Sequence, residues 1–186
     1  MMDKLIDYIR VYHNAIPNDL CDRIIKEFDT PEDMNPGRFG EGYGEIIPDL
    51  RNCFTSSITF QPNPTEIRLS IENELYSCLA TAMNTYMSEF RHVTIQRDLG
   101  SVLVKYLPGH FFNEHTDASA NSQKTIGCVG YANDDFTGGE FSFFNKTYFP
   151  EMKKGSLILF PANFMFPHAV SKVTSGVRYS IIDWFM

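Results

Sequence analysis

The sequence lacks the features expected of a membrane protein or a nucleic-acid-binding protein. No apolar run approaches membrane-spanning length, and the first residues, MMDKLIDYIRVY, carry charges where a signal peptide is apolar. No basic patch stands out, and 16 lysines and arginines against 23 aspartates and glutamates give a net charge of −7. This charge opposes contact with phosphate backbones and anionic lipids. We therefore expect a cytoplasmic protein that binds neither nucleic acid nor membrane.

Cysteine is also scarce, and no two cysteines form a CxxC pair. This spacing argues against a structural zinc site or a redox motif and agrees with a reducing compartment. We expect all four cysteines to be small buried residues: Cys21, Cys53, Cys78 and Cys128. Repeats and low-complexity tracts are absent as well. A chain of 186 residues that is 43 % hydrophobic fits a single domain spanning residues 1–186.

The first half of the chain, residues 1–95, is expected to form helices and a loop that support the β-core formed by the residues after it. Alternating β-branched and aromatic residues predict a strand over 6–16, and Asn18 or Asp19 can cap a helix that ends near Thr30. Residues 33–49 contain four glycines and two prolines, which predict a long loop suited to act as a lid over substrate. A helix capped by Thr65 follows. Its expected apolar stripe is Ile67, Ile71, Leu75, Leu79, Met83, Tyr86 and Phe90.

The second half, residues 96–186, changes to short strands separated by turn residues. The strand pattern begins just before it, and the predicted strands are 93–96, 101–106, 112–117, 124–133, 140–145, 156–160, 168–173 and 177–185. Short strands with glycine-rich breaks are typical of an antiparallel jelly roll. We therefore predict an α+β protein with a double-stranded β-helix (jelly-roll, cupin-like) core, an N-terminal strand and packing helices.

The triplet HTD at residues 115–117 is the first chemical signal. Side chains alternate along a strand, so His115 and Asp117 are expected on one face, where both can reach one ion. A second histidine would complete the 2-His-1-carboxylate triad that holds non-haem Fe(II). His168 is the candidate, because it opens a predicted strand. His110 is expected to be solvent-exposed rather than a ligand. Arg51 is expected to be a surface or structural residue, with contact to substrate as the alternative.

Four stretches together resemble one family. They are YLPGHFFNEHTD, YANDDFTGGEF, GSLILFP and HAVSKVTSGVRYS. Over residues 100–185 the sequence resembles the 2-oxoglutarate- and Fe(II)-dependent dioxygenases, in particular the prolyl 4-hydroxylase-like branch, with a weaker similarity in the N-terminal strand and helix. The resemblance implies that His115, Asp117 and His168 hold Fe(II), that 2-oxoglutarate and O2 complete its coordination, and that ascorbate is an additional candidate cofactor.

The same resemblance implies a cosubstrate site on the last strands. Arg178 fits the clamp for the far carboxylate of 2-oxoglutarate, because a guanidinium binds a carboxylate in a bidentate manner. Ser180 shares its strand face and can donate to the same carboxylate. Tyr131 and Tyr106 are expected to border this pocket, although tyrosines on strands are often core residues.

The predicted reaction is hydroxylation of a C–H bond, with peptidyl proline as the expected substrate and succinate and CO2 as products. The residues leave open a free amino acid or another small molecule as substrate, and also a catalytically silent jelly-roll binding module. Two related branches fit less well. Nucleic-acid demethylases carry a second arginine where this chain has Trp184, and halogenases lack the carboxylate that Asp117 provides.

Overall fold

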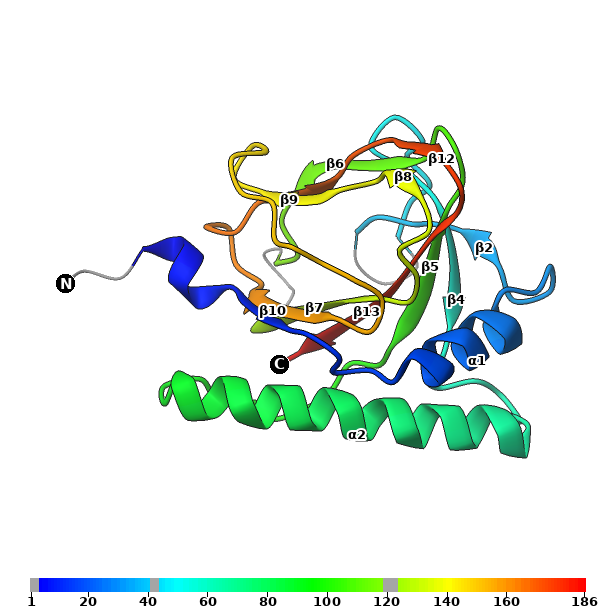
Figure 1. Ribbon diagram of the computed structural model, residues 1–186, viewed down its shortest axis with the longest axis horizontal. Helices are drawn as coiled ribbons and strands as arrows, with labels where there is room; N and C mark the ends of the chain where they lie inside the picture. Colours follow the sequence, from blue (N-terminus) through cyan, green and yellow to red (C-terminus); the bar gives the residue numbers. More distant parts are fainter. Residues whose placement is uncertain (1–3, 41–43, 119–123) are drawn as a thin grey trace.

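Two β-sheets face each other, and two helices cover the outer side of the larger sheet (Figure 1). The computed structural model describes residues 4–40, 44–118 and 124–186. In this part of the chain the larger sheet has the strand order β1-β10-β7-β13-β5-β4-β2, and the smaller has the order β3-β6-β11-β9. This arrangement confirms the predicted α+β double-stranded β-helix.

Most of the core strands lie where alternation and turn residues predict them. In the larger sheet they are β5 (Val102–Tyr106), β7 (Ile126–Tyr131), β10 (Leu157–Pro161) and β13 (Arg178–Phe185). In the smaller sheet they are β6 (Phe111–His115), β9 (Phe141–Phe143) and β11 (His168–Val170). A separate short pair is formed by β8 (Thr137–Gly138) and β12 (Val173–Ser175).

The central strands β10, β7 and β13 of the larger sheet are largely buried on both faces, and successive side chains enter different cores. On β10, Leu157 and Leu159 pack toward the helices, whereas Ile158 and Phe160 pack into the cluster between the sheets. On β13, Ile181 belongs to the helix-side core and the neighbouring Ile182 packs against the inter-sheet core. The larger sheet is therefore fixed by apolar burial on both sides, as alternation on a pleated strand requires.

The long helix α2 (Glu66–Glu89) starts as predicted, because the Thr65 side chain accepts a hydrogen bond from the Arg68 amide at 3.2 Å. Its buried stripe begins at Ile71, and the inclusion of Ile67 was wrong, since that residue in the first turn is 59 % exposed. Helix α1 (Asn18–Phe28) already includes Asn18 and Asp19, the two residues expected as candidate caps. Pro17 is its N-cap without a side-chain hydrogen bond, and the Cys21 amide donates to the Pro17 carbonyl.

Two predicted strands are not formed as expected. Residues 6–16 divide into a 3-10 turn, η1 (Leu5–Tyr8), and the short β1 (Arg10–Tyr12), which pairs only with β10 before Asn14 adopts a positive φ of 54°. Residues 93–96 make no strand. The amides of Gln96 and Arg97 both donate to the Met186 carbonyl instead of pairing along a ladder.

The N-terminal half also supplies short strands that the sequence did not predict. They are β2 (Asn35–Pro36), β3 (Arg51–Asn52) and β4 (Phe54–Ser57). Strand β3 adds to the smaller sheet and β4 to the larger one. All four cysteines are free thiols; three are buried, and Cys78 is half-buried. Among the described residues, none of the helices has the length and apolar character needed to cross a bilayer.

Candidate metal and cosubstrate site

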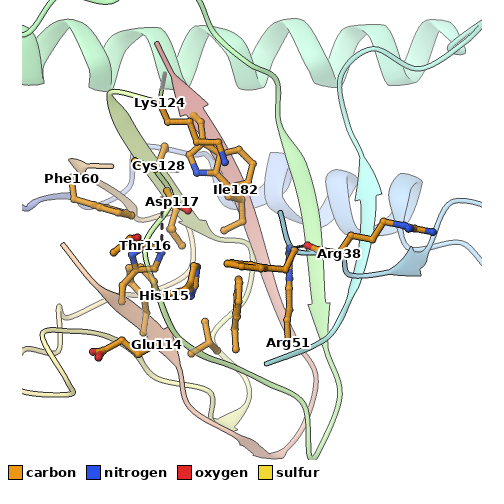
Figure 2. Close-up of a pocket in the computed structure, with 18 of the residues that line it drawn as sticks. Arg38, Arg51, Glu114, His115, Thr116, Asp117, Lys124, Cys128, Phe160 and Ile182 are labelled. Atoms are coloured by element: carbon orange, nitrogen blue, oxygen red, sulfur yellow. Dashed lines mark hydrogen bonds and ion pairs between the residues drawn. The ribbon is translucent and has the colours of Figure 1, made fainter. Parts of the chain in front are cut away.

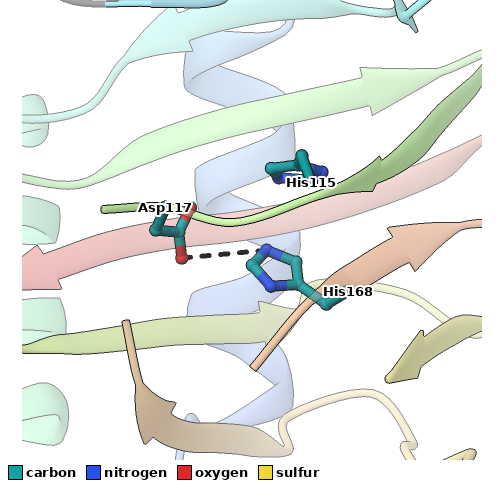
Figure 3. A group of neighbouring side chains, drawn as sticks. All are labelled: His115, Asp117 and His168. Atoms are coloured by element: carbon teal, nitrogen blue, oxygen red, sulfur yellow. Dashed lines mark ion pairs between the residues drawn. The ribbon is translucent and has the colours of Figure 1, made fainter. Parts of the chain in front are cut away.

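The two histidines of the predicted triad face each other across the smaller sheet. Strands β6 and β11 pair antiparallel, and their register places His168 directly opposite His115. One nitrogen of each imidazole and one carboxylate oxygen of Asp117 all lie within 4.8 Å of one another. His168 Nε2 is 3.7 Å from Asp117 Oδ2 (Figure 3). The three groups that sequence spacing selected are therefore brought together.

Asp117 reaches this cluster by a different route from the one predicted. It lies after β6 has ended at His115, so strand alternation does not place it. Its carboxylate instead lies against β7, where a Cβ on Gly127 would be only 2.9 Å from Asp117 Oδ2. The missing side chain at Gly127 leaves the space that the carboxylate occupies.

Both imidazoles are oriented by backbone carbonyls. His115 Nδ1 lies 2.9 Å from the Asn113 carbonyl oxygen, and His168 Nδ1 lies 3.0 Å from the Phe166 carbonyl oxygen. A carbonyl oxygen can only accept, so each Nδ1 carries the proton and donates it. In the neutral imidazole Nε2 then carries a lone pair, which is the form that binds a metal ion.

The protonation state of His115 fits the same role. Burial, followed by the proximity of His168, holds the pKa of His115 well below its usual range. The ring stacks on Phe112 with a centroid distance of 3.5 Å. A neutral imidazole in a fixed orientation is therefore present at neutral pH, as a metal ligand requires.

Arg178 lies at the buried end of the same cavity. It is only 1 % exposed, and its three guanidinium nitrogens have no hydrogen-bond partner within the described residues. Aromatic rings surround it instead, with centroids 4.7 Å away for Tyr131, 5.2 Å for Tyr106 and 5.9 Å for Phe136. A buried cation without a polar partner is unfavourable, so the site is built to receive an anion.

Neighbouring strands place the other three predicted cosubstrate residues beside Arg178. Tyr106 of β5 pairs with Arg178, and Tyr131 of β7 pairs with Ser180. Ser180 is fully buried, and its hydroxyl has no hydrogen-bond partner in the described ranges. The Tyr131 hydroxyl accepts from the Phe141 amide at 3.3 Å. Burial raises the pKa of Tyr106, which therefore keeps its proton and can donate to an anion.

The triad and Arg178 line one cavity of about 1250 Å³. Figure 2 shows part of its lining, with His115 and Asp117 labelled. Its walls also carry cations that sequence reasoning did not predict as site residues: Arg38, Arg51, Arg97 and Lys124. Arg51 was expected to be a surface or structural residue, and its guanidinium stacks on Phe112 at 4.8 Å while it lines the cavity. No local motif marks these positions, because they meet only through pairing between distant segments. His110 is half-buried beside Phe54 and is not part of the triad cluster.

The predicted lid segment reaches the cavity through Phe39. The Phe39 ring meets His115 edge-on with a centroid distance of 6.1 Å and meets Phe112 at 6.0 Å. Backbone hydrogen bonds of 2.8 Å in both directions pair Phe39 with Glu45. Three residues of the expected lid, Glu41, Gly42 and Tyr43, lie outside the described residues.

Comparison with known proteins agrees with this geometry. Residues 101–186 match the sequence profile of the 2OG-Fe(II) oxygenase superfamily. The match confirms the resemblance drawn from the four motifs. No curated protein sequence matches the chain.

Similar solved structures include three prolyl hydroxylases. A Trichoplax adhaerens enzyme in complex with a hypoxia-inducible-factor peptide fragment has a TM-score of 0.79 at 14 % identity, covering 96 % of this chain and 83 % of that chain. A Pseudomonas putida prolyl-4-hydroxylase has a TM-score of 0.72 at 18 % identity, covering 97 % and 96 %. A viral collagen prolyl hydroxylase from Paramecium Bursaria Chlorella virus-1, in a 2OG complex, has a TM-score of 0.66 at 17 % identity, covering 96 % and 95 %. At such low identities these structures establish the fold.

Proposed function

Residues 101–186 match the 2OG-Fe(II) oxygenase superfamily, and from this premise we propose that the protein is an enzyme of that superfamily and hydroxylates a prolyl residue of a peptide. The cosubstrates are 2-oxoglutarate and O2, and the products are the hydroxylated peptide, succinate and CO2. The proposal treats residues 1–186 as one cytoplasmic domain.

The metal is assigned to the His-Asp-His cluster. His115 and His168 offer Nε2 lone pairs, and Asp117 offers a carboxylate oxygen, which is the donor set of a facial triad for Fe(II). When bound, Fe(II) would activate O2, one oxygen atom of which goes to the substrate C–H and the other to succinate as 2-oxoglutarate loses CO2. The carbonyls that hold both Nδ1 protons keep the imidazoles aimed at the metal before it binds.

The cosubstrate is assigned to the buried end of the cavity. Arg178 offers a planar fork of donors to the far carboxylate of 2-oxoglutarate, and Ser180 and Tyr106 offer hydroxyl donors on either side. The aromatic rings around the guanidinium exclude water from this end. An ion pair in such surroundings is strong, because there is little solvent to screen it.

The substrate is assigned to the open end of the cavity, beside Phe39. This ring already lies against His115, so movement of the 33–49 segment would open or cover the metal site. Prolyl hydroxylases share the fold, and one of them is seen with a peptide fragment. A free amino acid is the second candidate, because the cavity also has room for a small molecule.

The observation that carries the proposal is the unpaired buried Arg178 in the same cavity as the triad. The test is to incubate the protein in air with Fe(II), 2-oxoglutarate and, in separate reactions, prolyl peptides or free amino acids, and to measure succinate together with a +16 Da product. His168→Ala is the control that should release no succinate. Succinate formed with a hydroxylated free amino acid alone would favour the second candidate, and no succinate above the His168→Ala level would refute the proposal.

Ascorbate is proposed as a reductant that keeps the iron in its Fe(II) state between turnovers. Its omission should lower the number of turnovers before the enzyme stops, while the initial rate stays the same. An unchanged total turnover without ascorbate would contradict this role.

A further inference from the structure

The strand pairing that supports Arg178 differs between its two sides. Strand β13 lies between β5 and β7 in the larger sheet (Figure 1). On the β5 side the ladder includes Arg178 itself. On the β7 side the register ends with Ser180 opposite Tyr131, and one further bond of 3.1 Å runs from the Ala132 amide to the Tyr179 carbonyl. Beyond this bond, the main chain of β13 is held by a side chain instead of a strand.

The side-chain amide of Asn133 continues the support where the ladder ends. Its Oδ1 accepts a hydrogen bond from the Tyr179 amide at 2.7 Å, and its Nδ2 donates to the Val177 carbonyl oxygen at 2.7 Å. These two groups belong to the residues immediately before and after Arg178. One side chain thus makes two bonds of the kind that a neighbouring antiparallel strand makes.

The orientation of this amide is fixed by its partners. Asn133 Nδ2 also donates to Asp135 Oδ1 at 2.6 Å, and a carboxylate oxygen can only accept. A rotated amide would place its oxygen against the Asp135 and Val177 oxygens and its nitrogen against the Tyr179 N–H, so all three bonds would be lost. Asn133 is therefore held in the orientation that supports both sides of Arg178.

The turn that leads into β13 packs against the same segment. Gly176 has a φ of +74°, and a Cβ there would lie 2.8 Å from the Asp135 carbonyl oxygen and 3.0 Å from Phe136 Cα. The centroid of the Phe136 ring lies 5.9 Å from the Arg178 guanidinium carbon. Residues 133–136 thus hold the main chain that carries Arg178 and also supply one wall of its pocket.

The direction of the Arg178 side chain depends on this main chain. Its three guanidinium nitrogens have no hydrogen-bond partner within the described residues. Its stem passes close to Gly139, where a Cβ would lie only 2.9 Å from Arg178 Cδ. Backbone position and packing alone therefore aim the guanidinium. A bidentate bond to a carboxylate needs both N–H groups in line, so a small shift of the backbone weakens it.

We propose that Asn133 is a positioning residue for the cosubstrate: it holds the main chain on either side of Arg178 and so aims the guanidinium at the far carboxylate of 2-oxoglutarate. This role rests on the proposed function and adds a residue to its cosubstrate site. Asn133 is not one of the described residues that line the cavity, so it acts through Arg178 and not by contact with the ligand.

Calorimetric titration of the Zn(II)-loaded protein, which supports no turnover, with 2-oxoglutarate tests this role. Asn133→Ala should raise the Kd about tenfold, because the Tyr179 amide and the Val177 carbonyl lose their partner and the main chain beside Arg178 loosens. Asn133→Asp should also weaken binding, since its carboxylate has no proton to donate to Val177. This variant keeps the bond from the Tyr179 amide, so it tests the role even if Asn133→Ala does not fold. The affinity for Zn(II) should stay the same in both variants, because the triad is intact.

Two controls separate positioning from a general loss of stability. Tyr179→Phe removes the 2.5 Å bond from the Tyr179 hydroxyl to Asp29 but keeps the bonds to Asn133. It should lower the Tm of the unliganded protein and bind 2-oxoglutarate as the parent does. Pyruvate keeps the 2-oxo acid group but lacks the far carboxylate, so its weaker binding at high concentration should be the same in the parent and in Asn133→Ala.

The outcomes distinguish this role from the proposed function. An unchanged Kd for 2-oxoglutarate in the Asn133 variants overturns the role, and so does an equal loss of affinity in Tyr179→Phe. An equal loss for pyruvate and 2-oxoglutarate also overturns it, because the effect would then not pass through Arg178. A parent protein that binds 2-oxoglutarate but forms no Fe(II)-dependent succinate removes the hydroxylase function alone, whereas a parent that does not bind 2-oxoglutarate overturns both.

Discussion

Replacement of Arg178 by methionine should change stability and cosubstrate binding in opposite directions. Methionine keeps most of the side-chain volume but removes the charge and every donor. Without ligand, the guanidinium is buried and unpaired, so its removal should stabilise the protein by about 1–3 kcal/mol, as when buried charges are replaced by apolar groups. The contacts with Tyr131 and Tyr106 offset part of this cost and keep the expected gain at the lower end.

The effect on 2-oxoglutarate should be a large loss of affinity. A desolvated carboxylate without its charged partner costs about 3–5 kcal/mol, which corresponds to a rise in Kd by a factor of roughly 10²–10⁴. The ligand itself should therefore stabilise the parent protein and leave the variant unaffected, because stabilisation follows the ratio of ligand concentration to Kd.

Thermal unfolding with and without 2-oxoglutarate measures both effects in one experiment. A gain of 1 kcal/mol is worth about 2–4 °C in Tm for a chain of this size. We expect Arg178→Met to have the higher Tm without ligand and the parent to show the larger rise when ligand is added. Arg178→Lys is the matched control, because it keeps the positive charge but loses the planar pair of N–H donors. A variant that is less stable without ligand, yet keeps its 2-oxoglutarate response, would refute the assignment of Arg178.

Three further predictions concern the metal, the sheet and the lid. His168→Ala should eliminate Fe(II)-dependent succinate and leave the circular dichroism spectrum unchanged; full activity would show that the third ligand lies elsewhere. Burial raises the pKa of Asp183 to about 8, so the folded carboxyl keeps its proton while the unfolded one ionises near pH 4. The free energy of unfolding should therefore fall between about pH 4 and 8, by at most about 1.4 kcal/mol per pH unit. Urea unfolding at several pH values should show a weaker pH dependence for Asp183→Asn. An equal pH dependence in both proteins would contradict this role of Asp183. Phe39→Ala should slow peptide hydroxylation several-fold while uncoupled 2-oxoglutarate turnover persists; an unchanged hydroxylation rate would exclude Phe39 from the lid.

The sequence was most informative where a local pattern and a long-range partner act together. The strand that begins at His168 was predicted as one of several short strands separated by turn residues, and the structure pairs it with β6 so that the two histidines meet. The proximity of Asp117 to the two histidines was predicted from side-chain alternation along one strand, which was the wrong reason. The Asp117 carboxylate occupies the space left by the missing side chain of Gly127 on β7. The spacing of residues along one strand cannot predict this contact with another strand.

The rest of the site depends on pairings between distant segments. Arg97 and Lys124 lie on either side of the end of β13 because of backbone hydrogen bonds to residues near position 185, and neither belongs to a motif. Strand β3, which carries Arg51, is only two residues long and shows no periodicity. Short elements of this kind are held by tertiary contacts, so intrinsic preference does not reveal them.

The pairing of β1 with β10 bears on how quickly the fold can form and be lost. Strand β1 lies near the N-terminus and β10 lies in the second half of the chain. The central strand β13 pairs with β5 and β7, which both precede it by a long stretch of sequence. Closing such long loops is slow, so the folding rate should be limited by topology. The pocket around Arg178 exists only once β13 lies between β5 and β7. A ligand that needs this completed pocket leaves the folding rate unchanged and acts by slowing unfolding, so it prolongs the lifetime of each folded molecule.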